Sequence, residues 1–171
     1  MSALNATAGV AIVPTAEPYF RGLHRALDIV AREGRYLAFT EAPPWEASLG
    51  FYREVIAGDL VQFVAVRDGE VLGCCDILPM LGQARAHVGR LGIWLLPEAR
   101  GQGTGARLLE SALNKARVKG ITRVELTVRV DNLNAKALYE RFGFVVEGLQ
   151  RDSTRVNGEY SDAWAMALLQ R

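Results

Sequence analysis

The segment that most constrains this chain is Gly101-Gln102-Gly103-Thr104-Gly105, which follows an apolar strand-like run and opens an amphipathic helix. The first amide groups of a helix lack partners within the helix and carry the positive end of its dipole. Glycine permits left-handed backbone angles and lets a ligand approach closely. The segment therefore predicts a phosphate or pyrophosphate site built from backbone amides, to which Arg100 would add a charged donor.

Two other phosphate-binding loops fit this segment less well. A Walker loop ends in Gly-Lys-Ser or Gly-Lys-Thr, whereas Gly105 is followed by Ala106 and Arg107. A dinucleotide-binding fingerprint has the spacing Gly-x-Gly-x-x-Gly, whereas the spacing here is Gly-x-Gly-x-Gly. A simple glycine-rich turn between a strand and a helix would have the same sequence. A second motif is therefore needed to distinguish a phosphate site from such a turn.

Apolar periodicity predicts one mixed α/β domain over residues 1–171. Asp68-Gly69 and Asn157-Gly158 are typical of hairpin turns, which a strictly alternating strand–helix fold would lack. The predicted element order is β-α-α-β-β-β-α-β-α-β-β. The strand patterns cover 10–13, 60–66, 71–78, 87–96, 123–130, 144–156 and 159–169. Helix patterns begin at Pro18, at Trp45, at the glycine segment and at a cap formed by Asp131 or Asn132.

Composition excludes several classes of function. Of 171 residues, 50% are hydrophobic and 23% charged, which is typical of a globular domain, and the net charge of +1 offers no surplus for nucleic acid. Cys74 and Cys75 suit neither a disulfide framework nor a zinc site, and alternation along a strand predicts one buried and one partly exposed thiol. Met1–Thr7 has no signal-peptide or membrane-span pattern. We expect a cytoplasmic protein without metal, nucleic-acid or membrane partners.

The second motif runs from Asn132 to Phe144 and reads Asn-Leu-Asn-Ala-Lys-Ala-Leu-Tyr-Glu-Arg-Phe-Gly-Phe. With the glycine segment, it resembles the GNAT superfamily of acyl-CoA-dependent N-acyltransferases. The family's first signature is Arg/Gln-x-x-Gly-x-Gly/Ala, and its second is Asn-x-x-Ala-x-x-Leu-Tyr-x-x-x-Gly-Phe. The matching residues are Arg100, Gly103 and Gly105 in the first, and Asn132, Ala135, Leu138, Tyr139, Gly143 and Phe144 in the second.

The resemblance covers residues 60–169 by motif and the first third by element order alone. The stretch from Gly143 to Met166 is similar to a bacterial subgroup that includes amino-acid N-acetyltransferases. The family fold implies a mixed, mostly antiparallel seven-stranded sheet with about four helices. It also implies acetyl-coenzyme A as the co-substrate, held between the strands at 87–95 and 123–130.

The resemblance assigns roles to both motifs. Asn132 would contact the cofactor, and Tyr139 would lie near the thioester sulfur and act as its general acid. The backbone at Ile93, Trp94 and Leu95 would align the pantetheine arm and the acetyl carbonyl. The pyrophosphate would be bound by Arg100 and by the amides of Gly101, Gln102, Gly103, Thr104, Gly105 and Ala106.

The general base is open at this point. Direct attack of an amine on a thioester requires the amine to lose a proton. His87 stands where some family members carry a catalytic glutamate, and the pKa of histidine suits the task, although an exposed strand-end histidine would look the same. Glu41, Asp76, Glu125, Thr127 and a water chain are the alternatives.

The sequence leaves the acceptor open as well. We expect a primary amine on a small molecule, such as an amino acid or a xenobiotic. A protein N-terminus or lysine is the alternative within the family, and a non-catalytic acyl-CoA sensor is the alternative outside it. The apolar C-terminal strand predicts a surface that could pair in a homodimer.

Overall fold

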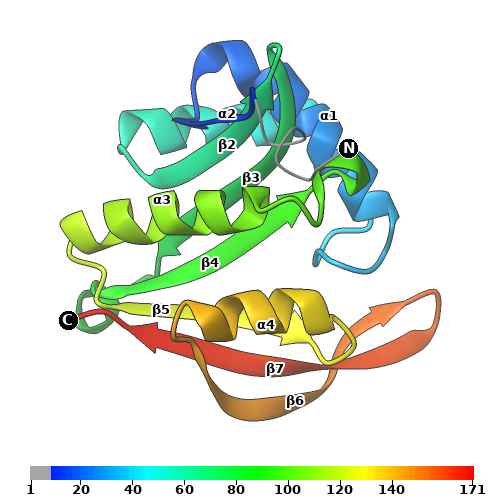
Figure 1. The fold of residues 1–171 in the computed structure, drawn as a ribbon, viewed down its shortest axis with the longest axis vertical. Coiled ribbons are helices and arrows are strands. Elements are labelled where there is room, and N and C mark those ends of the chain that lie inside the picture. Colours follow the sequence, from blue (N-terminus) through cyan, green and yellow to red (C-terminus); the bar gives the residue numbers. More distant parts are fainter. Residues whose placement is uncertain (1–8) are drawn as a thin grey trace. The chain divides into compact units, whose positions relative to one another are not determined.

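The computed structural model describes residues 9–171, so the prediction for Met1–Thr7 lies outside the described residues. In the described part, seven strands and four α-helices follow in the predicted order (Figure 1). The elements are β1 Ala11–Pro14, α1 Phe20–Arg32, α2 Trp45–Ala57, β2 Val61–Arg67, β3 Glu70–Pro79, β4 Val88–Leu95, α3 Thr104–Val118, β5 Arg123–Arg129, α4 Leu133–Arg141, β6 Val145–Val156 and β7 Glu159–Leu169.

The strands form one mixed sheet in the order β1-β2-β3-β4-β5-β7-β6. The β1–β2, β2–β3, β5–β7 and β6–β7 pairs are antiparallel, whereas β4 and β5 are parallel. The parallel pairing joins Val88–Arg90 to Arg123–Glu125 and ends there. The prediction of a mixed, mostly antiparallel seven-stranded sheet with four helices is confirmed.

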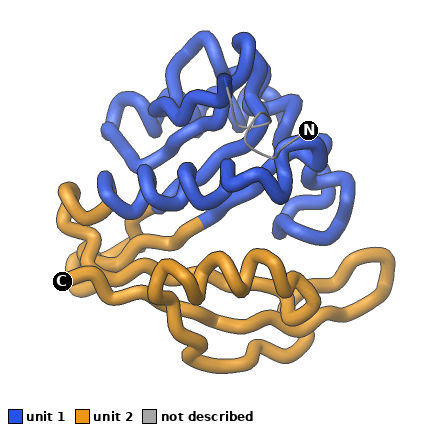
Figure 2. Tube along the Cα trace, viewed as in Figure 1, with its two compact units in different colours: residues 1–77, 92–115 blue, residues 78–91, 116–171 orange. Residues whose placement is uncertain are grey.

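The chain divides into two compact units (Figure 2). Unit 1 holds the chain up to Ile77 together with Gly92–Lys115, and unit 2 holds Leu78–Leu91 together with Ala116–Arg171. Unit 1 therefore contains β1, β2, α1, α2 and most of β3 and α3. Unit 2 contains β5, α4, β6 and β7.

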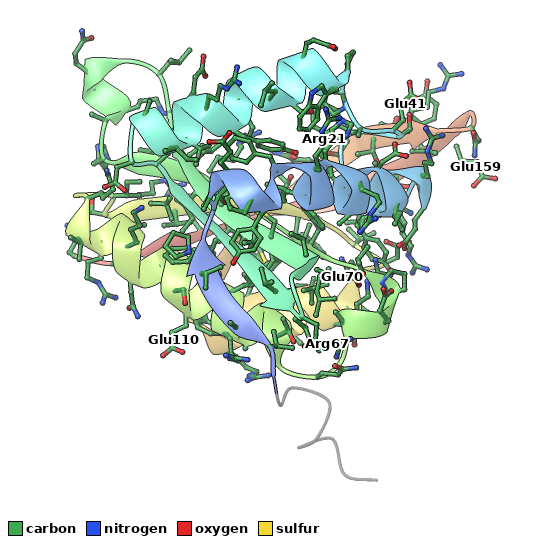
Figure 3. All side chains as sticks on the ribbon, turned by 90° about the horizontal axis from the view of Figure 1, so that it is seen from above. Arg21, Glu41, Arg67, Glu70, Glu110 and Glu159 are labelled. Atoms are coloured by element: carbon green, nitrogen blue, oxygen red, sulfur yellow. The ribbon has the colours of Figure 1, made fainter. Side chains whose placement is uncertain are left out.

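In unit 1, helices cover both faces of β2 and β3. Figures 1 and 3 show α3 on one face and α1 and α2 on the other. Cys74 lies close enough to Tyr52 of α2 to contribute to the raised pKa of that phenol, while Lys115 of α3 lies over the ring of Phe63, which pairs with Cys75. Cys74 and Cys75 are consequently both buried, at 2% and 0% exposure. The prediction of one partly exposed thiol is wrong, because it assumed that one face of the strand is open to solvent.

In unit 2, α4 begins at a side-chain cap. The Asn132 side chain accepts a hydrogen bond from the Ala135 amide at 3.3 Å, which satisfies one of the free amides of the first turn. Gly143 ends the helix region with a φ of 95°, a left-handed angle that favours glycine. Among residues 9–171, no helix is both long and apolar enough to cross a lipid bilayer.

Candidate active site

The glycine loop of unit 1 presents unpaired backbone amides. Gly101 and Gly103 have φ angles of 70° and 83°, and no atom lies within 4 Å of a Cβ built at either position. Helix α3 begins at Thr104, and its first turn closes with the Arg107 amide donating to the Gly103 carbonyl at 3.2 Å. In the part of the chain that the structure describes, no amide from 101 to 106 donates to a backbone carbonyl. These N–H groups are available to an anion.

The side chains of the loop leave this surface open. Gln102 turns back and donates to the Glu98 carbonyl at 3.0 Å. Thr104 is 1% exposed, and its Oγ1 has no hydrogen-bond partner among the described residues. A buried hydroxyl without a partner costs stability, so this oxygen is a polar group that a bound ligand or a water would satisfy.

Arg100 has protein partners in the structure. Its Nε and Nη2 donate to the Leu95 carbonyl at 3.1 and 2.9 Å, and its Nη1 and Nη2 donate to the Glu33 carboxylate at 3.0 and 2.8 Å. The guanidinium carbon also lies 4.5 Å from the ring centroid of Tyr36. The side chain thus ties the end of β4 to the end of α1, whereas the sequence suggested a donor for phosphate.

Ile93, Trp94 and Leu95 form the carboxyl end of β4 and are half-buried, and a short 3-10 turn at Pro97–Ala99 separates them from the loop. A Cβ built at Gly73 of β3 would lie 2.6 Å from the Trp94 carbonyl oxygen and 2.4 Å from a Leu95 methyl carbon. Position 73 therefore has room only for glycine. The Leu96 amide donates to the Leu72 carbonyl at 2.8 Å, which fixes the end of β4 further.

In unit 2, Tyr139 is the one buried residue of α4, at 6% exposure. Its ring centroid lies 5.7 Å from that of Phe144 in a tilted arrangement. This packing fixes the ring, and Asn132 caps the same helix. The two residues that the second motif assigns to the cofactor therefore sit on one short, well-anchored element.

His87 lies in the exposed turn before β4, and not in the strand itself. Its carbonyl accepts the amides of Thr122 and Arg123 at 2.9 and 3.1 Å, so its backbone has a structural role. It precedes Ile93 by six positions, a separation that an extended strand spans in about 20 Å. His87 therefore comes just before the first residue of β4, whereas Ile93–Leu95 are its last three residues.

Two other base candidates have charged partners. Glu41 is 69% exposed and lies 3.5 Å from Arg32, on the outside of the loop between α1 and α2 (Figure 3). Glu125 accepts from Arg85 at 3.2 Å and from Arg123 at 2.9 Å. Thr127 is exposed on β5. Each of these environments is that of a surface residue or a surface ion pair.

Asp76 on β3 differs from all of them. Its Oδ2 accepts from Gln62 Nε2 at 3.2 Å, and the Gly92 amide also donates to the carboxylate. Burial raises the pKa of Asp76 from 3.8 to about 6, and these two hydrogen bonds lower it only in part. A carboxylate with a pKa near neutrality is suited to exchange protons at physiological pH.

The comparison with known proteins adds the family. The model of the Acetyltransferase (GNAT) family matches residues 23–144. The chain belongs to this family. The match includes both sequence motifs and extends the resemblance into the first third of the chain, which element order alone had suggested.

Relatives of this acetyltransferase have different acceptors in their names. The L-amino acid N-acetyltransferase AaaT of Escherichia coli is 35% identical over 107 residues, which are 62% of this chain and 66% of that protein. The N-alpha-acetyltransferase RimI of Mycobacterium tuberculosis is 36% identical over 131 residues, covering 75% of this chain and 77% of that protein. A GNAT-family acetyltransferase structure from Streptococcus pneumoniae superposes with a TM-score of 0.86 at 28% identity, covering 94% and 99% of the two chains.

The prediction of an acetyl-CoA-dependent N-acetyltransferase is confirmed at the level of the reaction class. The residues of unit 1 fit the diphosphate of acetyl-CoA, because they combine free amides, two left-handed glycines and open space above them. Among residues 9–171, no group of three His, Cys, Asp or Glu side chains could hold a metal ion.

Sequence reasoning missed several residues around the site. Glu33 was not considered as the partner of Arg100, because the pair is separated by 67 positions. The sequence does not link Gln62 and Gly92 to Asp76, because those links depend on how β3 pairs with its neighbours β2 and β4. A polar residue inside an otherwise apolar strand, as at Gln62 and Asp76, was the one available signal.

Proposed function

We propose that this enzyme transfers the acetyl group of acetyl-CoA to the primary amine of a small molecule, such as an amino acid or an amine-bearing xenobiotic, by direct attack in a ternary complex. The observation that carries the proposal is the array of free amides at the start of α3, which follows the half-buried end of β4 after one short turn. Such an array binds diphosphate without a basic surface, as the net charge of +1 requires.

The proposed roles follow from the local chemistry. Amides from Gly101 to Ala106 bind the diphosphate, with Arg100 holding the loop in place through Leu95 and Glu33. The backbone at Ile93–Leu95 aligns the acetyl carbonyl and donates to the negative charge that develops on its oxygen. Asn132 contacts the cofactor, and Tyr139 donates a proton to the leaving sulfur.

The acceptor class is supported by the similarity to an L-amino acid N-acetyltransferase. The second candidate is acetylation of a protein N-terminus, which the similarity to an N-alpha-acetyltransferase favours. The two differ in what lies beyond the amine: a free amino acid offers a carboxylate next to it, whereas a protein N-terminus offers an amide.

The test is release of free thiol from acetyl-CoA across amino acids, polyamines, drug amines and short peptides. We expect release with one class of small amine, and a drop of about 100-fold or more in kcat for Tyr139→Phe with unchanged acetyl-CoA affinity. Release with peptides alone would replace the small-molecule acceptor by the protein one. Acetyl-CoA binding without release for any acceptor would favour a sensor.

Gly103→Val serves as the control for the cofactor site. A β-branched side chain is strained at a φ of 83° and would also fill the open space above the amides. We expect acetyl-CoA binding to be lost while the far-UV spectrum is retained. Normal acetyl-CoA binding by this variant would contradict the proposed role of the loop.

We further propose that residues 1–171 act as one cytoplasmic domain, in keeping with two buried free thiols. A homodimer is proposed through β6 and β7, where Val145, Leu149 and Leu169 are 62%, 48% and 57% exposed. Sedimentation of the wild type and of Leu149→Lys checks this proposal. A wild-type monomer would overturn it.

A further inference from the structure

Asp76 is a carboxylate whose partners are all neutral. Gln62 donates to it at 3.2 Å, and Gln62 in turn accepts from Thr15 Oγ1 at 2.9 Å, with Thr15 and Gln62 only 8% and 3% exposed. In the part of the chain that the structure describes, no lysine, arginine or histidine contributes to the electrostatics of Asp76. A carboxylate with little exposure normally has a cationic partner, so half-buried Asp76 is free to interact with a cation that arrives from outside.

A ligand would reach the Asp76 carboxylate from solvent past Gly92 of β4. Gly92 is exposed, and a Cβ built there would meet one atom within 4 Å, the Asp76 Oδ1 at 3.2 Å. Any other residue at position 92 would therefore stand over the carboxylate. The absent side chain leaves one oxygen accessible to a small polar group, while Gln62 and the Gly92 amide fix the carboxylate.

Gly92 directly precedes Ile93–Leu95, the part of β4 that we propose to align the acetyl carbonyl. A group that reaches Asp76 over Gly92 therefore lies one residue from the proposed reaction centre. All of these residues belong to unit 1, and Asp76 lies on the face of β3 that carries Cys74 and faces α2.

We propose that Asp76 is the general base of the acetyl transfer and that the opening over Gly92 admits the ammonium group of the acceptor. This assignment rests on the proposed function and adds the residue that activates the amine. The geometry of the neutral chain Thr15–Gln62–Asp76 and the open position at Gly92 carry it.

The proton balance is as follows. Asp76 takes one proton from the acceptor ammonium, and the freed nitrogen lone pair forms a C–N bond to the acetyl carbon. The C–S bond breaks, and sulfur leaves with the bonding pair and takes up one proton. The nitrogen loses a second proton, which balances the proton taken up by sulfur, and Asp76 returns its own proton to solvent. The products are the acetamide, free coenzyme A and one proton.

The groups around Asp76 in residues 9–171 carry no positive charge that could pair with its carboxylate. Cys74 and Cys75 on the same strand have pKa values well above the ordinary value because both are buried, so their thiols stay neutral. Burial raises the pKa of Tyr52 on α2 as well. Gln62 on β2, Thr15 after β1 and the Gly92 amide on β4 carry no charge. Asp76 is therefore ionised above about pH 6 and remains unpaired until the acceptor binds.

The experiment measures kcat/KM against pH with an accepted amine for the wild type and Asp76→Asn. For the wild type we expect an acid limb near pH 6. For Asp76→Asn we expect kcat to fall by about 100-fold or more, with no acid limb near that pH and an unchanged KM for acetyl-CoA. An Asp76→Asn protein that keeps the kcat and the acid limb of the wild type overturns the assignment.

Two more variants keep the test independent of misfolding. Gln62→Leu removes a donor that favours the ionised form, so we expect the acid limb to move to higher pH while the plateau rate is largely kept. Gly92→Ala places a methyl group 3.2 Å from Asp76 Oδ1, so we expect KM for the amine to rise more than KM for acetyl-CoA. An unmoved acid limb in Gln62→Leu would count against Asp76.

Cys75→Ala is the matched control, because it changes the neighbouring residue on the opposite face of β3. We expect its pH profile to equal that of the wild type. Acetyl-CoA binding is measured by calorimetry on every protein. A wild type that binds acetyl-CoA but acetylates nothing overturns the proposed function and the assignment together, whereas an active wild type with an active Asp76→Asn overturns the assignment alone.

Discussion

Asp76 in unit 1 and Glu125 in unit 2 are both strand carboxylates with little exposure, yet their surroundings are opposite. Asp76 accepts from an amide side chain and a backbone amide. Glu125 accepts from two arginines, and one of these, Arg123, also binds Glu147. The two carboxylates therefore differ in their neighbours: neutral donors contact Asp76, whereas cationic donors contact Glu125.

The pKa shifts in the two regions run in opposite directions. Burial raises the pKa of Asp76 to about 6. In unit 2, the hydrogen bond from Arg123 lowers the pKa of Glu147. Asp76 is therefore suited to the proton exchange that we propose for it, whereas Glu147 stays ionised and links its strand to Arg123 of β5.

The largest expected difference between the two regions is in turnover. We expect Glu125→Gln to change kcat by no more than about 3-fold, against about 100-fold or more for Asp76→Asn. The reason is that Glu125 already has its charge satisfied by Arg85 and Arg123. Parallel assays at one pH with a saturating amine check this, and a larger loss for Glu125→Gln would reverse the comparison.

The second difference is in stability against pH. The folded pKa of Asp76, about 6, exceeds its ordinary value of 3.8, so the stabilisation from its proton is present at low pH and is lost as the pH rises toward 6. Between about pH 4 and about pH 7.5, this lowers the free energy of unfolding by about 2 kcal/mol. Urea unfolding of the wild type and Asp76→Asn at both pH values measures it. Equal pH dependence in the two proteins would show that Asp76 titrates normally.

The smallest expected effect is that of the arginine in unit 2. Arg123→Gln removes the charge-assisted hydrogen bonds to Glu125 and Glu147, and we expect a loss of ~1 kcal/mol in the free energy of unfolding. Because the partners are partly exposed, salt should reduce the difference between variant and wild type. Urea unfolding at low and high salt checks this, and a salt-independent loss would point to packing instead of charge.

The fold could be predicted from sequence where local signals are strong. The start of α2 and both ends of β7 agree with the predicted patterns, and the glycine segment opens α3 as expected. His87 fell outside β4 because strand ends have weak signals. Cys74 and Cys75 were misjudged because alternation gives the two faces of a strand but not the helices that cover each face.

In the candidate site too, features with a local sequence signal could be predicted, whereas contacts between distant segments could not. The left-handed glycines of the loop and the Asn132 cap could be predicted from sequence, because glycine and capping residues act through nearby backbone, whereas the site roles of these residues and of Tyr139 stay predictions. The partners of Arg100 and Asp76 could not, because Glu33 and Gln62 come from distant segments and meet them only through tertiary structure. Asp76 was one of several open candidates for the base until the β2–β3 register showed its neighbours.

The burial of both cysteines has a practical consequence for measuring this enzyme. The reaction releases a thiol, and the chain has two thiols of its own, at Cys74 and Cys75, with pKa values raised by burial. Only the thiolate reacts rapidly with disulfide reagents, so the folded enzyme should contribute almost no colour of its own. A thiol-reactive dye then counts coenzyme A while the protein is native, and the same dye reports unfolding when two further thiols per chain begin to react.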